Sequence, residues 1–502
     1  MILLYNPPSS AHRKPVLPMS LLALGAMLEG HLEYAILDGN LLADPYTALD
    51  RAIRERDVRL LGVTIMPGPQ LEAAVPLCRR LKAAHPHLTI VWGGYFPTLH
   101  YDACLRAGYV DYVVRGCGEH TFAALARALL TDGAHPCPAE RAPGPLPGLA
   151  HRTPGSGEIV ANGVCPLPDP DDLPEWPYHR VDVARYARPT FMGRRTLPHH
   201  SSYGCPFRCN FCAVVGLSGG RWVAESAQRT AAVTHRLVKE WGADSIEFYD
   251  NNFFVSEART AEFAGRIAGL GIHWWGEARI DTLLRYDERT WERMRASGLK
   301  MVFVGAESGS DETLRRMNKG GQAAAARALE IAQKMAHYGI VPEMSFVLGN
   351  PPDPAADAHQ TMAFIRRVKQ VNPETEIVLY LNTPVPPPAD DPALLDPAAV
   401  DGFLFPETLD EWLEPQWAEF SQRRNPGTPW LGDSLRAQIH DFQHVLNAYY
   451  PTVTDPRLAG VRRWIPRTLA AWRYHLRVYR FPIELRLLNR LMGYRRPETS
   501  GL

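Results

Sequence analysis

The sequence lacks a long apolar run, an excess of charge of either sign, and a fourth cysteine near its one cysteine cluster. No uncharged apolar tract reaches about 18 residues, so we expect no membrane-spanning segment. Basic and acidic residues number 54 each, and a net charge of zero gives no whole-chain field that would favour nucleic acid. The N-terminus, MILLYNPPSS, has neither a basic leader nor a small-residue cleavage site. It therefore predicts a first buried strand in a cytoplasmic protein.

The composition is that of a globular protein with large cores. Of the 502 residues, 46% are apolar and 22% are charged. At about 150 residues per domain, this length indicates two to four domains. No internal repeat is visible.

Residues 1–132 alternate short apolar runs with helical patterns. We expect strands at 2–5, 34–37, 60–65, 89–92 and 110–114, and helices at 18–29, 45–56, 70–84, 101–107 and 119–130. Strands separated by helices form a parallel, doubly wound, Rossmann-like α/β sheet. Ligands of such a sheet bind at the carboxyl ends of its strands.

Three further regions follow. Residues 133–195 are rich in proline and predict an extended linker with a few short strands. Residues 196–385 return to strand–helix alternation, which predicts a parallel partial barrel of six strands with its chemistry in the loops that follow them. Residues 386–502 begin with a second proline-rich hinge at 386–400, and the rest has a mainly helical pattern. The six strands are expected at 196–202, 245–249, 273–276, 300–305, 342–348 and 376–381.

Five of the eight cysteines are scattered along the chain. In a large chain without an export signal we expect no disulfides. Each scattered cysteine is expected to be a buried, inert thiol. These five are Cys78, Cys104, Cys117, Cys137 and Cys165.

The other three cysteines lie within the stretch GCPFRCNFCAV at 204–214, directly after the first strand of the partial barrel. Their spacing is Cys205-x3-Cys209-x2-Cys212. Thiolates are the soft ligands that suit iron–sulfur clusters and zinc. A structural zinc site would normally use four ligands, often as two CxxC pairs, and no second pair exists here. Three thiolates instead leave one iron of a cubane cluster open for a substrate or cofactor.

This spacing, with Phe211 before the last cysteine, resembles the radical S-adenosylmethionine (SAM) superfamily. The resemblance implies a 4Fe-4S cluster on the three cysteines, with SAM bound through its amino and carboxyl groups to the fourth iron. It also implies that one electron from the cluster cleaves SAM and releases a 5′-deoxyadenosyl radical. A low-potential flavodoxin or ferredoxin type of partner would supply that electron.

The same resemblance implies SAM contacts in the loops after the later barrel strands. Asp250 and Asn251 stand where the family places polar groups for the SAM amine, although either could instead cap a helix. Arg279 could pair bidentately with the SAM carboxylate, or form an ion pair in the barrel wall. The remaining candidates for contact with SAM are Phe211, Glu307, Ser308 and Tyr380.

A doubly wound domain ahead of such a barrel resembles the cobalamin-binding subclass of radical SAM enzymes. That subclass includes carbon and phosphorus methylases and the anaerobic protoporphyrin-ester cyclase. Its cobalamin domains carry DxHxxG, then SxL, then GG, and the histidine lies below cobalt. Here Asp38 opens the first pattern, Asn40 replaces the histidine, Thr64 takes the SxL place, and Gly93 and Gly94 take the GG place.

The stretch VVRGCGEHTF also resembles the subclass, and it implies that Gly116, Gly118 and Glu119 lie beside the cobalamin ring. Because an amide is a poor cobalt ligand, we expect cobalamin to bind without a histidine below the metal. The alternative is a flavodoxin-like domain that has lost cobalamin and docks the substrate.

The expected activity is methyl transfer from cobalamin to an unactivated carbon of a small or lipid-like biosynthetic intermediate. One alternative is a radical oxidative cyclase or rearrangement enzyme of the same superfamily. A second, of another class, is a non-catalytic iron–sulfur and cobalamin sensor or electron carrier. A carrier would normally coordinate all four irons with cysteine, which favours the enzyme.

Residues 457–496 hold eleven arginines and a single acidic residue, Glu484. Aromatic residues such as Trp464 and Trp472 are interleaved with the arginines. A basic, amphipathic helix of this kind can contact an anionic membrane surface, bind a partner, or cover an apolar core. A solvated or inter-domain helical face and a peripheral membrane contact are both open interpretations, and no nucleic-acid-binding module accompanies the charge.

Overall fold

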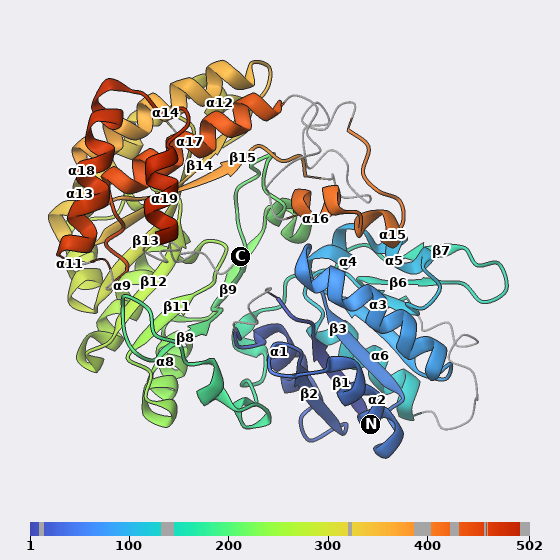
Figure 1. The fold of residues 1–502 in the computed structure, drawn as a ribbon. Helices are drawn as coiled ribbons and strands as arrows, with labels where there is room; N and C mark the ends of the chain where they lie inside the picture. The colour runs from blue at the N-terminus through green and yellow to red at the C-terminus, as the bar shows by residue number, and fades with distance from the viewer. Residues whose placement is uncertain are drawn as a thin grey trace. The chain divides into compact units, whose positions relative to one another are not determined.

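Figure 1 shows the computed structural model of the chain, which describes residues 1–9, 15–131, 145–319, 324–385, 403–421, 431–455, 458 and 460–491. Cys137, the hinge at 386–400 and the first part of the predicted linker lie outside these residues. The chain divides into two compact units. The first comprises Met1–Tyr186, Pro198–Arg229 and Thr383–Gly427, and the second comprises Ala187–Leu197, Thr230–Asn382 and Thr428–Leu502.

The first unit is built on a seven-stranded sheet with the order β2-β1-β3-β4-β5-β6-β7. Neighbouring strands from β1 to β5 are parallel, which confirms the predicted doubly wound sheet, and β6 and β7 extend it antiparallel. The strands are β1 (Ile2–Asn6), β2 (Tyr34–Asp38), β3 (Leu60–Thr64), β4 (Thr89–Gly93), β5 (Tyr112–Val114), β6 (Leu149–Arg152) and β7 (Ile159–Ala161). The short strands expected in the proline-rich region are therefore β6 and β7.

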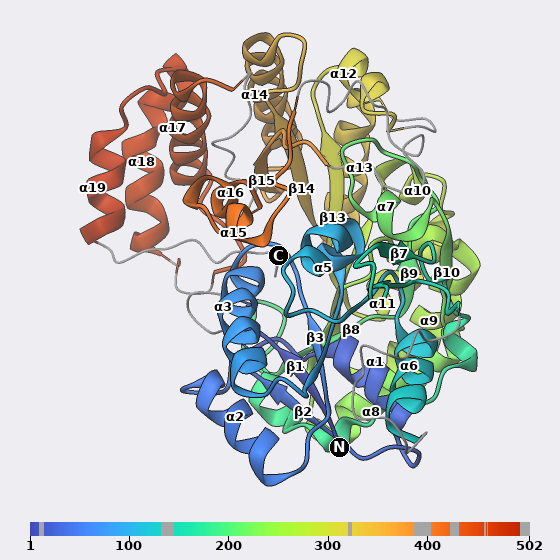
Figure 2. The ribbon, with the colours of Figure 1, turned by 90° about the vertical axis from the view of Figure 1, so that its right-hand side faces the viewer.

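Helices cover both faces of this sheet (Figures 1 and 2). Helices α1 (Met19–Leu28) and α6 (Glu119–Thr131) bury one face, and α2 (Pro45–Glu55), α3 (Pro69–Ala84) and α5 (Tyr101–Arg106) bury the other. The sequence pattern did not indicate α4 (Tyr95–Leu99), because its five residues are too few to display a helical period.

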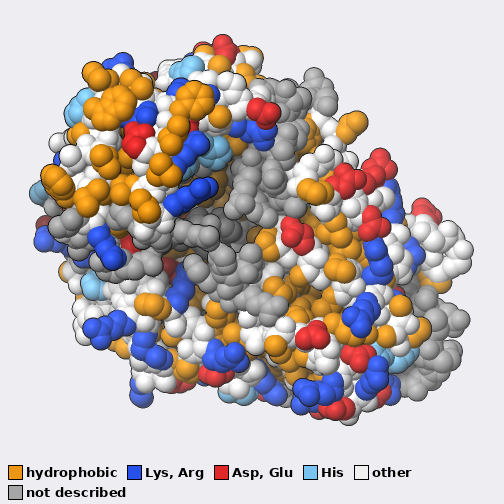
Figure 3. Space-filling model, in the orientation of Figure 1, with side chains coloured by type: hydrophobic (Ala, Val, Ile, Leu, Met, Phe, Trp, Pro, Cys, Tyr) orange, Lys and Arg blue, Asp and Glu red, His pale blue; other side chains and the backbone are white. Residues whose placement is uncertain are grey.

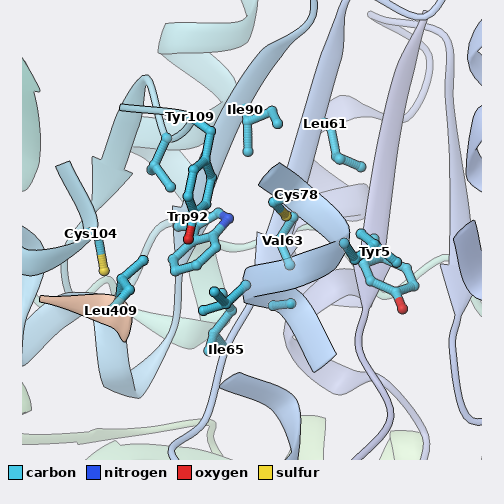
Figure 4. Close-up of a cluster of buried hydrophobic side chains, with 14 of the residues drawn as sticks. Tyr5, Leu61, Val63, Ile65, Cys78, Ile90, Trp92, Cys104, Tyr109 and Leu409 are labelled. Atoms are coloured by element: carbon cyan, nitrogen blue, oxygen red, sulfur yellow. The ribbon is translucent and has the colours of Figure 1, made fainter. Parts of the chain in front are cut away.

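The larger core of the first unit surrounds the fully buried indole of Trp92 (Figure 4). The ring of Tyr109 packs edge-on at 6.1 Å between centroids, and the thiols of Cys78 and Cys104 lie in the same cluster. Burial raises the pKa of Cys78 to about 12, which fits the expectation of an inert thiol. Leu409 of α15 (Leu409–Trp412) and the following helix α16 (Pro415–Ser421) complete this core from far along the chain.

The second unit contributes to a six-stranded sheet with the order β15-β14-β13-β12-β11-β8. The pairs from β11 to β15 are parallel, and β15 and β8 are its two edges, as in the predicted partial barrel. The strands are β8 (Thr196–His199), β11 (Ser245–Phe248), β12 (His273–Ala278), β13 (Leu299–Glu307), β14 (Val341–Leu348) and β15 (Glu376–Leu381). The helices between them are α8 (Ala227–Trp241), α9 (Glu257–Ile267), α10 (Ile280–Leu283), α11 (Glu288–Ala296), α12 (Asp311–Arg316), α13 (Ala325–Tyr338) and α14 (Pro354–Val371).

The strand expected at 196–202 is in fact two strands. It divides into β8 and β9 (Ser202–Gly204), and β9 pairs antiparallel with β10 (Trp222–Ala224). The hairpin of β9 and β10 encloses the cysteine loop, so that loop follows β9 rather than β8.

The C-terminal region is helical, as predicted. It packs α17 (Asp433–Tyr449), α18 (Val461–Leu476) and α19 (Ile483–Leu491) against one another, and α17 also contacts α14. Within the described residues, the structure contains no helix with the length and apolar character needed to cross a bilayer.

Candidate functional site

Polar side chains gather at the carboxyl ends of β1 and β2 in the first unit. Asp38 Oδ1 accepts hydrogen bonds from Asn6 Nδ2 at 3.0 Å and from Asn40 Nδ2 at 2.8 Å. The oxygen of the Asn40 amide accepts hydrogen bonds from the backbone N–H and the hydroxyl of Ser9 at 2.9 and 3.2 Å. The oxygen of the Asn40 amide therefore holds the loop that follows β1, and its nitrogen holds Asp38 at the end of β2. The Asn40 amide is thus used in contacts within the chain, which fits cobalamin bound at this edge without a cobalt ligand from position 40.

The predicted SxL and GG positions touch each other at the same edge. Gly94 has a φ of +98°, and a Cβ there would lie 3.0 Å from the backbone nitrogen of Ile65 and 3.1 Å from Thr64 Oγ1. Both the backbone conformation and the lack of space therefore require glycine. Gly93 is less constrained, since a Cβ there would meet only a carbonyl oxygen at 3.5 Å.

The loop after β5 carries Gly116, Gly118 and Glu119. A Cβ at Gly116 would lie 2.7 Å from Val164 Cγ1, and one at Gly118 would lie 3.0 Å from Val114 Cγ1. The chain's own packing thus accounts for both glycines, in addition to any approach of a planar ring. Cys117, between them, is a partly exposed free thiol, unlike the buried Cys165.

Glu119 is the first residue of α6 and is buried. Its Oε1 accepts a 3.1 Å hydrogen bond from the hydroxyl of Tyr203, whereas its Oε2 is buried without a hydrogen-bond partner among the described residues. Burial raises the pKa of this carboxyl above its usual range. Tyr203 belongs to β9, the strand that ends just before Cys205, so this hydrogen bond ties the predicted cobalamin domain to the cysteine loop.

The three clustered cysteines lie on the loop between β9 and α7 (Val214–Ser218). Cys209 is buried, and Cys205 and Cys212 are partly exposed. The backbone N–H of Cys212 donates to the carbonyl of Cys209 at 3.1 Å, which closes a tight turn. Gly204, with a φ of +75°, begins the loop, where a Cβ would lie 2.3 Å from the carbonyl oxygen of Arg221.

The cysteine loop is anchored on the edge of the sheet that carries Gly94. Ala213 and Val215, which follow the last cysteine, pack with Leu99 of α4 and with Val385 in a small apolar core. Helix α4 begins directly after Gly94. The predicted cluster loop and the predicted cobalamin edge are therefore neighbours within the first unit.

The donor set of this loop fits an iron–sulfur cluster. Three soft sulfur donors lie on eight consecutive residues, and two of them reach solvent. In the described ranges, the side chains of His, Cys, Asp and Glu form no group of three gathered as ligands. The fit therefore depends on the chemistry and spacing of the thiols.

In the second unit, acidic side chains face one another across β11, β12 and β14. Glu277 on β12 lies near Asp250, after β11, and near Glu343, which accepts a 3.3 Å hydrogen bond from Trp275 Nε1. Burial, together with the charges of Glu343 and Asp250, raises the pKa of Glu277 to about 8. At neutral pH this carboxyl holds its proton. Glu277 lies in the sequence GEARID at 276–281, and nothing in this stretch indicates its protonation state.

Two buried ion pairs follow β12 and β13. Arg279 binds both carboxylate oxygens of Asp281, at 3.0 and 3.1 Å, so its Nε and Nη2 already serve a carboxylate of the chain. Lys319 Nζ donates to Glu307 Oε1 at 2.6 Å, and Ser345 Oγ donates to Glu307 Oε2 at 3.2 Å. Both pairs contribute residues to one small cavity, which Gly305 and Ala306 also line.

Glu307 has a φ of +62°, a strained conformation for a residue with a side chain. Gly305 accommodates this conformation, because a Cβ there would lie only 2.0 Å from Glu307 Oε1. No sequence signal indicated Lys319, because a lone lysine before a glycine-rich stretch is normally exposed.

The other predicted SAM contacts are placed differently. Ser308 is buried against α14, where it approaches Asp357 Oδ1 at 3.4 Å and Thr361 Oγ1 at 3.3 Å, so it holds a loop of the chain. Asn251 is exposed, and it is the next residue, Asn252, that is buried. Tyr380 on β15 and Phe211 in the cysteine loop are both partly buried. These four residues remain predictions as ligands of SAM.

Comparison with known proteins identifies two domain families along the chain. The family profile described as a B12 binding domain matches residues 13–126, and the profile described as the radical SAM superfamily matches residues 200–365. The first match covers β2 to β5 of the doubly wound sheet, and the second covers the cysteine loop and most of the partial barrel. The chain therefore contains both domains that its motifs predicted.

Two named proteins are similar to this chain in sequence over most of its length. An uncharacterized methyltransferase of Pyrococcus horikoshii is 27% identical over 378 residues, which cover 73% of this chain and 78% of that protein. The anaerobic magnesium-protoporphyrin IX monomethyl ester cyclase of Synechocystis is 27% identical over 333 residues, which cover 64% and 63%.

A solved structure with the same fold is that of TsrM from Kitasatospora setae, a radical SAM methyltransferase with cobalamin and a [4Fe-4S] cluster bound. It matches with a TM-score of 0.64 at 18% identity and covers 98% of this chain and 99% of that chain. At this identity the likeness concerns the fold.

Proposed function

We propose that this chain, which belongs to the radical SAM enzymes with a B12 binding domain, transfers a methyl group to an unactivated carbon of a small or lipid-like molecule. The cluster with SAM supplies a 5′-deoxyadenosyl radical, and cobalamin supplies the methyl group. The chain's own residues bind these groups, orient them and exclude water.

The residues that would hold these groups lie in the loops described above. The cysteine loop would hold the cluster through Cys205, Cys209 and Cys212, and the sheet edge at Thr64, Gly93 and Gly94 would receive cobalamin. Asp38 and Asn40, together with the loop of Gly116, Gly118 and Glu119, would line the same edge. In the second unit, Lys319 Nζ holds the side chain of Glu307 in place through a 2.6 Å hydrogen bond, which suits a group that accepts hydrogen bonds from the ribose or amine of SAM.

The observation that carries this proposal is the packing of the cysteine loop on α4. Because α4 begins directly after Gly94, a cluster on the loop and cobalamin at the sheet edge would occupy neighbouring sites of the first unit. A methyltransferase that uses both groups in one reaction needs this proximity. The partly exposed Cys205 and Cys212 also leave a path by which a flavodoxin or ferredoxin could deliver the electron.

The experiment uses anaerobically reconstituted full-length protein with cobalamin, a low-potential reductant and SAM labelled in its methyl group. A methyltransferase of this type consumes SAM in two ways, so we expect both 5′-deoxyadenosine and S-adenosylhomocysteine, with label on the corrinoid. If 5′-deoxyadenosine forms while the corrinoid stays unlabelled and no S-adenosylhomocysteine appears, the enzyme is a cyclase or rearrangement enzyme, and the methyl-transfer proposal is wrong.

A further inference from the structure

The exposed apolar side chains of this protein are concentrated on its last two helices. Of the twelve large apolar side chains that are exposed in the described part of the chain, nine lie between 464 and 491. We call these nine the apolar face: Trp464, Leu469, Trp472, Leu476, Val478, Phe481, Ile483, Leu487 and Leu491. Figure 3 shows hydrophobic side chains interspersed with basic ones over the region where α18 and α19 lie in Figure 1.

The apolar face follows helical spacing on both helices. Trp472 and Leu476 are separated by one turn of α18, and Ile483, Leu487 and Leu491 recur every four residues along α19. Some of these side chains are very open, with 70% of Leu476 and 86% of Leu491 exposed. The opposite sides of the helices are buried through residues such as Ala470, Tyr474 and Leu485, so the core of this region is already filled. The apolar face is thus a second apolar side of these helices, separate from the buried side that packs into the core.

The link between the two helices is fixed in the shape that exposes these side chains. Arg473 is buried, and it donates to the backbone carbonyls of Val478, Arg480 and Phe481 at 3.0 to 3.2 Å and to the carboxylate of Glu484. Asp441 of α17 accepts from the backbone N–H of Phe481 at 3.1 Å. Phe481 itself has a φ of +52°, a conformation that costs energy and needs such support. The exposure of Phe481 is therefore built into the fold.

Cationic side chains surround the apolar face. The exposed arginines of α18, α19 and their link include Arg462, Arg467, Arg477 and Arg490, and none of these four has an ion pair with a described residue. Two carboxylates of the helices here are ion-paired: Glu484 with Arg473, and Asp441 with Arg480 and Arg486. Asp433 of α17 pairs with Arg436. Among the described residues of these helices, the four unpaired arginines therefore leave an excess of positive charge.

We propose that the apolar face and its arginines dock on the surface of an anionic lipid bilayer. Apolar side chains can enter the boundary between headgroups and acyl chains, while arginines extend to lipid phosphates. A second copy of the chain fits less well, since it would bring two sets of unpaired arginines together. This placement goes beyond the proposed methyl transfer, and it would bring the enzyme to the phase in which a lipid-like substrate dissolves.

The test is sedimentation of the full-length protein with vesicles of phosphatidylcholine, alone or mixed equally with phosphatidylglycerol. We expect the protein to pellet with the mixed vesicles at low salt and much less with the neutral ones. Binding should weaken about tenfold or more on raising salt, because the anionic surface is screened. The emission of Trp464 and Trp472 should shift to the blue on binding, as the indoles leave water.

Matched variants distinguish binding through the apolar face from nonspecific binding to the vesicles. The double variant Leu476→Asp and Leu487→Asp should lose vesicle binding by about tenfold or more, since each charge would have to enter the interface. Leu404→Asp changes an apolar residue outside the face that is even more exposed than these two, and this variant should bind as the parent does. All three proteins should show the same far-UV circular dichroism, because the changed residues are exposed.

Three results would overturn the proposal. They are absence of binding to the mixed vesicles, equal binding of the double variant and the parent, and a dimer in sedimentation velocity that the double variant abolishes. Because vesicle binding requires neither cluster nor SAM, a failure to bind vesicles would leave the proposed methyl transfer standing. A failure of methyl transfer would likewise leave the proposed membrane docking standing.

Discussion

The hydroxyl of Tyr203 donates a hydrogen bond of 3.1 Å to Glu119, and it thereby joins the strand before Cys205 to the first residue of α6. The contact connects two segments of the first unit that are 84 positions apart in the sequence. Glu119 Oε2 has no hydrogen-bond partner among the described residues, and Tyr203 is the side chain that donates to Oε1 of this buried carboxyl. Loss of the hydroxyl would leave the carboxyl without that donor.

Tyr203→Phe should therefore lower the free energy of unfolding of the apoprotein by roughly 1 to 3 kcal/mol, the usual cost of a buried polar group without a partner. Urea unfolding followed by circular dichroism measures this loss. Glu119→Gln keeps an acceptor for Tyr203 and should cost less than Tyr203→Phe. A Tyr203→Phe protein as stable as the parent would show that the hydrogen bond does not link the two segments.

Gly94→Ala should abolish cobalamin binding. A Cβ would press on Ile65 and Thr64 at about 3 Å, and the positive φ adds roughly 1 to 2 kcal/mol of strain. The readout is the amount of corrinoid that remains with the protein after gel filtration. Gly30→Ala is the matched control, because Gly30 also has a positive φ but a Cβ there has no neighbour within 4 Å. We expect Gly30→Ala to lower the free energy of unfolding and to keep cobalamin. If both variants retain equal amounts of corrinoid, Gly94 does not line the cobalamin site.

Asn40→His tests the prediction that Asn40 stands in the place of the cobalt-binding histidine of related cobalamin domains. One ring nitrogen could keep the contact that Asn40 Nδ2 makes with Asp38, and the other would be free to bind a metal. We expect the cobalamin absorption spectrum to change and the electron paramagnetic resonance signal of reduced cobalamin to show a nitrogen ligand. Asn40→Ala should leave both signals as in the parent. Spectra of Asn40→His identical to those of the parent would mean that position 40 does not lie below cobalt.

The raised pKa of Glu277 predicts that the stability of the protein depends on pH. Its pKa of about 8 in the folded protein lies above that of an unfolded glutamate, so the folded state binds more protons between these values. The free energy of unfolding should therefore fall as pH rises from about 5 to about 8. Because the residue keeps some exposure to solvent, which screens the effect, we expect a total of roughly 1 to 3 kcal/mol.

The measurement is urea unfolding at several pH values, for the parent and for Glu277→Gln. The amide cannot ionise, so Glu277→Gln should flatten this part of the profile and be the more stable protein at pH 8. Glu262→Gln, on the exposed side of α9, should reproduce the parent's profile. Parallel profiles for the parent and Glu277→Gln would contradict the assignment of a neutral carboxyl.

The sequence alone was enough to predict both parallel sheets, because their strands are apolar runs separated by amphipathic helices. It also identified the cysteine loop, since three thiols within eight residues form a ligand set that is typical of an iron–sulfur cluster. The five-residue α4 lacks a helical period, and its role appears only when Leu99 packs against Val215. Similarly, the return of Leu409 and Trp412 to the core around Trp92 is a long-range contact with no local signal.

Side-chain pairing was the least predictable part of the candidate site. Arg279 was expected either to bind a carboxylate of SAM or to form an ion pair, and the structure shows the ion pair with Asp281. Ser308 lies in the expected loop, but its hydroxyl is buried against Asp357 and Thr361 of α14. Such outcomes depend on the orientation of a side chain at the end of a strand, which the pattern of residue types does not determine.

The most direct test of the central claim measures both cofactors in one sample. The full-length protein is reconstituted anaerobically with iron, sulfide and cobalamin, then reduced in the presence of SAM, and 5′-deoxyadenosine and bound corrinoid are quantified together. We predict that both are present, and that Cys209→Ala loses cluster iron and 5′-deoxyadenosine while keeping the corrinoid. The partly exposed Cys117 offers the control, since Cys117→Ala should retain all three. A fully assembled cluster that yields neither 5′-deoxyadenosine nor bound corrinoid would contradict the account.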